Sequence, residues 1–73
     1  MTVSYNKLWK LLIDRKMKKK DLQQIAGVSA SLVTKLGREE SVTTAALMKI
    51  CNALKCDIGD IMEIIPDEQN LRL

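Results

Sequence analysis

Residues 17–38, MKKKDLQQIAGVSASLVTKLGR, carry the clearest structural pattern in this 73-residue chain. Their first half spaces three apolar residues as on one helix face: Leu22, Ile25 and Ala26. Gly27 follows, where a residue with positive φ ends a helix at little cost. The Ser29 hydroxyl can then accept a hydrogen bond from the free amides of a second helix. Two short helices joined by a glycine turn predict a helix-turn-helix motif over about 18–37.

The second predicted helix, about 29–37, has an unusual surface. Its apolar stripe is narrow and consists of Leu32, Val33 and Leu36. Its other faces carry mostly small side chains, namely Ser29, Ala30, Ser31, Thr34 and Lys35. A helix that faces solvent usually carries Glu and Lys instead, whereas a helix in a DNA groove gains from small, uncharged or basic side chains. This surface therefore favours double-stranded DNA as the partner.

Apolar spacing predicts three further helices around the motif. A first helix over 4–16, capped by Ser4, has a stripe of Tyr5, Leu8, Trp9, Leu12 and Ile13. Trp9 lies in the middle of this stripe and is expected in the core, whereas residues 1–3 are expected without regular structure. A fourth helix begins after Thr43 and ends near Lys55. A fifth follows Asp57 and stops before Pro66, so that we expect an all-α, five-helix bundle.

The chain length predicts one domain over 1–73, ending in a short polar tail, 67–73. The fifth helix would carry apolar residues around most of its circumference, and a monomer seldom leaves such a patch exposed. We therefore expect a homodimer contact made by Ile58, Ile61, Met62 and Ile65. An alternative stays open: the patch over 58–65 docks a different protein, as in an antitoxin-like module, with DNA binding secondary or lost.

Charge is distributed unevenly along the sequence. Residues 1–38 contain nine Lys or Arg and two acids, a net charge of +7, whereas residues 39–73 contain three Lys or Arg and seven acids, a net charge of −4. Such asymmetry indicates a polyanion as partner of the basic half. RNA is a weaker alternative, because Tyr5 and Trp9 are the only aromatic residues available to stack on bases.

Other functions lack the residues that they need. The chain has no His, no Gly-rich phosphate loop and no convincing activated nucleophile, so we expect no enzyme, no cofactor and no small-molecule substrate. Cys51 and Cys56 are too few to bind zinc by themselves, and Cys51 is expected as a buried small apolar residue. No apolar run spans a bilayer and no signal peptide is visible, which predicts a cytoplasmic protein that does not bind membranes.

The pattern also resembles a known family. Within the motif, the shared positions are Leu22, Gly27, Val28, Ser29, Ser31, Val33, Lys35 and Leu36. The flanking runs that extend the likeness start at Tyr5 and Leu47, and the match covers about residues 4–66. These positions resemble the helix-turn-helix of phage repressor and Cro-type (XRE-like) regulators, in their small single-domain bacterial form. Gln23, Lys18 and Gly37 depart from the family's usual residues.

This resemblance implies a small transcriptional regulator, a repressor, that binds DNA as a homodimer on a near-palindromic operator. The helix over 29–37 would enter the major groove, where Ser29, Ala30, Ser31, Thr34 and Lys35 face the DNA. Lys35 can donate to guanine or to phosphate, and the sequence leaves both open. The preceding helix would cross the phosphate backbone with Lys18 and Lys19, and Arg38 would hold the next phosphate.

Overall fold

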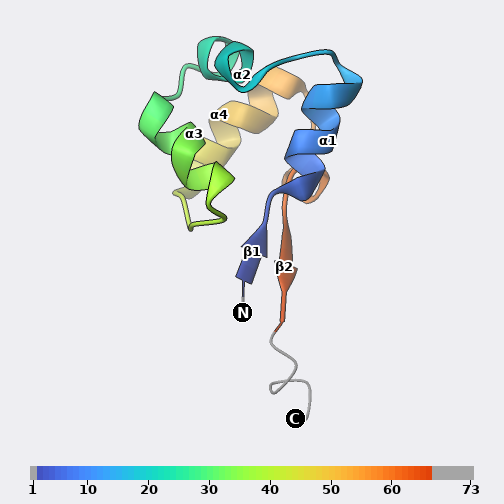
Figure 1. Cartoon of the computed structure of the whole chain (residues 1–73), viewed down its shortest axis with the longest axis vertical. Coiled ribbons are helices and arrows are strands. Elements are labelled where there is room, and N and C mark those ends of the chain that lie inside the picture. The colour runs from blue at the N-terminus through green and yellow to red at the C-terminus, as the bar shows by residue number, and fades with distance from the viewer. Residues whose placement is uncertain (1, 67–73) are drawn as a thin grey trace.

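The computed structural model describes residues 2–66. Over this range, four α-helices lie above a two-stranded antiparallel sheet (Figure 1). In chain order the elements are β1 (Thr2–Ser4), α1 (Asn6–Asp14), α2 (Lys19–Ala26), α3 (Ala30–Gly37), α4 (Thr44–Leu54), a 3-10 turn (Ile58–Asp60) and β2 (Glu63–Ile65).

The helix-turn-helix forms where its capping residues predict it. The Lys18 N–H, just before α2, donates to Asp21 Oδ2 at 2.8 Å. At the other end Gly27 adopts φ 67°, and its N–H donates to the Gln23 carbonyl at 3.1 Å. Ser29 Oγ accepts from the Leu32 N–H at 3.1 Å and opens α3. The predicted motif over about 18–37 is therefore confirmed, with local hydrogen bonds at each boundary.

Helices α4 and α1 differ in how well the sequence predicts them. Thr43 Oγ1 accepts from the Ala46 N–H at 3.2 Å and opens α4, as expected, and Lys55 closes it with φ 54°. Helix α1 is shorter than predicted, because Tyr5 rather than Ser4 precedes its first turn and Lys16, with φ 55°, already lies in a turn. At its end Ile13 is 73% exposed, so that the predicted apolar stripe stops at Leu12.

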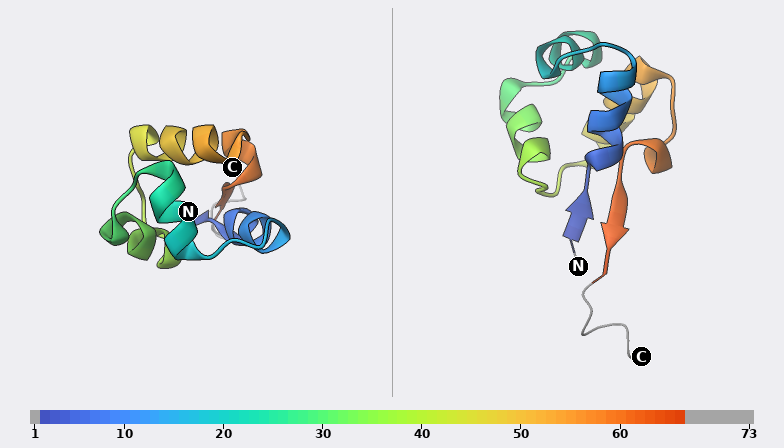
Figure 2. Two further views of the ribbon diagram at one scale, coloured as in Figure 1. Left: turned by 90° about the horizontal axis from the view of Figure 1, so that it is seen from above. Right: turned by 45° about the vertical axis from the view of Figure 1, so that its right-hand side comes forward.

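The core lies between α1, α2, α3 and α4 and is almost entirely aliphatic. Its buried residues are Tyr5, Leu8, Leu12, Leu22, Leu36, Leu47, Ile50, Leu54 and Ile61. Figure 2 shows α4 along one side of the bundle, with α1 and α3 on the opposite side. The Tyr5 hydroxyl donates to the Glu40 carbonyl at 2.9 Å, which ties the start of α1 to the loop after α3.

The prediction of a fifth helix is wrong. Residues 58–60 form only one 3-10 turn, and residues 63–65 form strand β2, which pairs with β1 in the register Thr2 to Ile65, Val3 to Ile64 and Ser4 to Glu63. The expectation that residues 1–3 lack regular structure is therefore also wrong from Thr2 onward. The described chain is a mostly helical bundle with four α-helices and a small sheet, and the predicted tail, 67–73, lies outside the described residues.

The isoleucines explain this difference. Ile58, Ile61 and Ile65 have helical spacing, but β-branched residues are also favoured in strands when a partner strand is available. The partner here comes from the opposite end of the chain, which no local pattern reveals. Two residues expected at a dimer contact are less accessible than a helix would make them. Ile61 is fully buried in the core and cannot contact a second copy, and Met62 is half-buried against the core.

Candidate nucleic-acid interface

One side of α3 faces solvent with small and basic side chains. The residues that the sequence places there are all exposed, namely Ala30, Ser31, Thr34, Lys35 and Arg38. The opposite side of α3 contributes Val33 and Leu36 to the buried residues. The narrow apolar stripe therefore anchors the helix, and its outer surface stays available for a partner.

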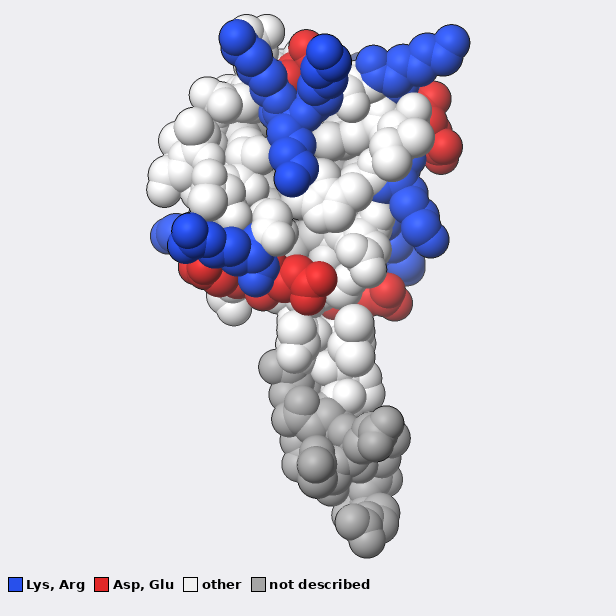
Figure 3. Space-filling view, in the orientation of Figure 1, with Lys and Arg blue, Asp and Glu red and all other residues white. Residues whose placement is uncertain are grey.

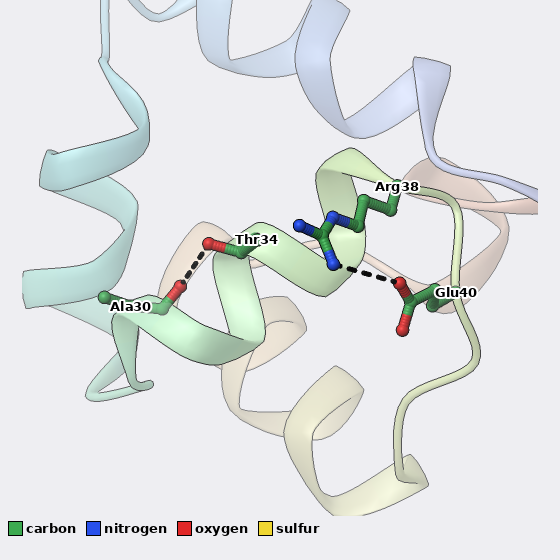
Figure 4. Close-up of polar contacts among 4 residues, drawn as sticks. All are labelled: Ala30, Thr34, Arg38 and Glu40. Atoms are coloured by element: carbon green, nitrogen blue, oxygen red, sulfur yellow. Dashed lines mark hydrogen bonds and ion pairs between the residues drawn. The ribbon is translucent and has the colours of Figure 1, made fainter.

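Two hydroxyl groups on α3 already make hydrogen bonds, and this limits their chemistry. Ser29 Oγ accepts from the Leu32 N–H, so its own O–H remains able to donate to a phosphate or a base. Thr34 is the reverse case: its hydroxyl donates to the Ala30 carbonyl at 3.0 Å (Figure 4), which leaves its oxygen as an acceptor. Ser29 is thus suited to meet acceptors and Thr34 to meet donors.

Arg38 follows α3, and its side chain is largely exposed. Its guanidinium Nη1 lies 3.9 Å from Glu40 Oε2, with 72% and 47% of the two side chains exposed (Figure 4). An ion pair this long and this exposed is weak and is screened by salt. Arg38 can therefore exchange Glu40 for a phosphate group at little cost in free energy.

A second basic group lies at the start of α2. Lys18, Lys19 and Lys20 are all exposed there, beside the free backbone amides of the helix N-terminus. Figure 3 shows several basic side chains at the α2 end of the molecule, with acidic side chains among them, and further basic side chains lower on both sides. Free amides and lysines together favour an anion such as a backbone phosphate.

Lys19 also makes a contact that the sequence does not predict. Its Nζ lies 4.6 Å from the centre of the Trp9 ring, on α1. A methyl group added at Gly37, the last residue of α3, would lie 3.7 Å from the same nitrogen. Trp9 is half-buried against the core, as its stripe position predicts, but its remaining surface carries a lysine of the candidate interface.

Comparison with known proteins fits this geometry. Residues 7–67 match the family of Cro/C1-type HTH DNA-binding domains. The chain belongs to this family. Over 60 residues it is 37% identical to the uncharacterized HTH-type transcriptional regulator YozG of Bacillus subtilis (strain 168), a match that covers 80% of this chain and 71% of YozG. It also superimposes on a crystal structure of the transcriptional regulator VanUg with a TM-score of 0.86 and 56% sequence identity, over 90% of this chain and 88% of that one.

The Cro/C1-type family is one of DNA-binding domains of transcriptional regulators, which are not typically enzymes. Burial, and secondly the neighbouring Cys56, raise the pKa of the Cys51 thiol, which therefore stays protonated at neutral pH.

In residues 2–66, no group of three or more His, Cys, Asp or Glu side chains is placed to hold a metal ion. None of the helices described is long and apolar enough to cross a membrane.

Proposed function

We propose that this Cro/C1-type domain is a transcriptional repressor that binds double-stranded DNA sequence-specifically, as a homodimer on a near-palindromic operator. The observation that carries the proposal is the outer face of α3, where small and basic side chains are exposed, together with two groups of phosphate-binding candidates toward the C-terminal end of α3. Those groups are Lys18 and Lys19 at the start of α2, and Arg38 after α3. We propose that the whole chain, 1–73, works as this single domain.

Each residue has a distinct role in the proposed complex. Helix α3 lies in the major groove, where Ser31, Thr34 and Lys35 meet base edges and the Ala30 methyl packs against a thymine methyl. Ser29, which also caps α3, donates to a phosphate. Lys18, Lys19 and Arg38 bind phosphates and set the position of α3 without reading sequence.

The proposed homodimer follows from the same contacts. Few of these side chains can make bidentate base contacts, so that one half-site gives modest specificity, and two symmetric half-sites are needed. Three isoleucines in and before β2 are exposed: Ile58 is 37% exposed, Ile64 56% and Ile65 46%. Ile64 and Ile65 are successive residues of β2 and therefore point to opposite faces of the sheet. We propose Ile58 and Ile65, with the half-buried Met62, as the contact between two copies, without the buried Ile61.

Selection of bound duplexes from a random pool tests DNA reading and symmetry together. A consensus with two-fold symmetry supports the proposal. Affinity should fall as salt rises, with a log–log slope of about 0.9 per phosphate contact. A protein that retains no duplex at low ionic strength and high micromolar concentration contradicts it.

Matched charge changes locate the binding surface. Lys35→Gln should weaken binding to the selected duplex, and the double reversal Lys19→Glu with Lys35→Glu should abolish it. Lys55→Gln removes the same single charge from the end of α4, outside the proposed contacts, and should leave affinity within about twofold. Equal losses in Lys35→Gln and Lys55→Gln would mean that only net charge matters.

The exposed isoleucines also support the second candidate, a module that docks a different protein. Sedimentation or size-exclusion measurements separate the two. A homodimer that Ile65→Asp converts to a monomer supports the repressor proposal. The matched control is Met48→Asp, which changes another exposed apolar side chain, on α4. A wild-type protein that stays monomeric at high micromolar concentration favours the docking module.

A further inference from the structure

Three helices converge on the Lys19 ammonium group. Lys19 is the first residue of α2, Trp9 belongs to α1, and Gly37 is the last residue of α3. The Lys19 Nζ lies 4.6 Å from the centre of the indole ring, within the range of a cation–π contact. It lies also near Gly37, where an added methyl group would be 3.7 Å away.

Electrostatics favours this position for the ammonium group. A positive charge is disfavoured at the N-terminus of its own helix and is further repelled by Lys18 and Lys20 beside it. The C-terminal end of α3 carries the opposite partial charge, and the face of the indole ring is also negative. The Lys19 ammonium therefore lies near two negative features, the C-terminal end of α3 at Gly37 and the face of the Trp9 ring on α1.

We propose that Trp9 is a positioning residue, which holds the Lys19 ammonium ready for a DNA phosphate. This inference rests on the proposed DNA binding. A free lysine loses the rotamer freedom of a four-carbon stem when it contacts a phosphate, whereas a stem already held over a ring loses less. Lys19 remains exposed while its Nζ lies over the ring, so that the other side of the ammonium is available to the phosphate.

The contact itself can be tested without DNA. Ring currents of Trp9, the only tryptophan, should move the ε-methylene protons of Lys19 upfield of those of Lys20 in the NMR spectrum. Trp9→Leu should abolish the shift. Identical Lys19 and Lys20 resonances in the wild-type protein would overturn the inference at this step.

A double-mutant cycle tests the role in binding. Trp9→Leu should weaken binding to the selected duplex about two- to fivefold, as expected for an exposed cation–π contact. In a Lys19→Met background, which keeps the stem and removes the charge, Trp9→Leu should have no further effect. Trp9→Phe keeps a smaller ring in the same packing site and should lose less affinity than Trp9→Leu, so that the test survives if the leucine variant is unstable.

The outcomes distinguish the two proposals. If the wild-type protein binds no duplex, the proposed function fails. If it binds, but the Trp9 variants bind equally well or more tightly, the proposed function stands and the positioning role is overturned. A loss of affinity of the same size in the wild-type and Lys19→Met backgrounds also overturns it, because the effect then does not pass through the ammonium.

Discussion

The helix-turn-helix and the closing segment, residues 56–66, are held in place by different kinds of contact. In the motif, the hydrogen bonds that start and end α2 and α3 join residues three to five positions apart. In the closing segment, Ile61 packs into the shared core and β2 pairs with β1, from the opposite end of the chain. The first region is thus defined locally, whereas the second takes its conformation from distant residues. Mutations should therefore affect the two in different ways.

The largest effect is expected within the closing segment itself. Ile61→Ala should lower the free energy of unfolding by about 2–5 kcal/mol, because it removes a fully buried side chain. Ile65→Ala, at a position 46% exposed, should cost less than about 1 kcal/mol. Urea denaturation, at concentrations where the protein is monomeric, compares the two. Equal losses would contradict the difference in burial between the two positions.

Two glycines of the helix-turn-helix should respond with opposite signs. Gly27→Ala should destabilise the protein by about 1–2 kcal/mol, because φ 67° is strained for any residue with a Cβ. Gly37 is helical, and an added methyl group meets only the flexible end of Lys19, so that Gly37→Ala should stabilise by about 0.5–1 kcal/mol. Thermal unfolding measures both, and a stabilising Gly27→Ala would show that the turn is not left-handed.

Tyr5 ties the start of α1 to the loop after α3, and its hydroxyl can be removed alone. Tyr5→Phe loses the hydrogen bond to the Glu40 carbonyl and should cost about 1 kcal/mol at neutral pH. Burial raises the pKa of Tyr5 above its ordinary value of 10.0, so that the folded state keeps the hydroxyl proton to a higher pH than the unfolded state does.

The stability that this shift contributes is complete below pH 10.0 and is lost as the pH rises through the folded-state pKa. Denaturation measured between neutral and strongly alkaline pH should therefore show a fall in stability. The fall should be shallower in Tyr5→Phe. Parallel pH profiles for the two proteins would mean that Tyr5 ionises as it does in an unfolded chain.

The smallest effect on overall stability is expected in the sheet. Ile64→Pro removes a backbone N–H and fixes φ opposite Val3, whereas Ile64→Ala keeps the backbone unchanged. Because a two-stranded ribbon adds little stability by itself, the proline should cost less than about 1 kcal/mol beyond the alanine. Hydrogen exchange should then show faster exchange in β1 and unchanged exchange in α2 and α3. Faster exchange in α3 would mean that the two regions are coupled.

The same contrast explains what the sequence could predict. Gly27, Ser29 and Thr43 each act within a few residues, and each marks the helix boundary that the structure has. Residues 58–65 could not be assigned in this way, because their spacing suits a helix and only pairing with Thr2–Ser4 makes them a turn and a strand.

In the candidate interface, too, the sequence predicts the features that depend on nearby residues and not those that depend on packing between helices. Exposure of Ser31, Lys35 and Arg38 followed from their positions opposite the apolar stripe of α3. The contact between Trp9 and Lys19 depends on how α1 packs beside α2, and no spacing within either helix encodes it. The hydrogen bond from Tyr5 to Glu40 was missed for the same reason.

The antiparallel pairing of β1 and β2 has a practical consequence. Thr2 and Ile65 lie opposite each other at one end of the molecule, whereas the start of α2 lies at the other end (Figure 1). A bulky fusion partner placed ahead of Thr2 will crowd Ile64 and Ile65 and leave α3 unobstructed. An affinity tag there would oppose the proposed contact between two copies, so cleaved protein is the appropriate material for measuring self-association.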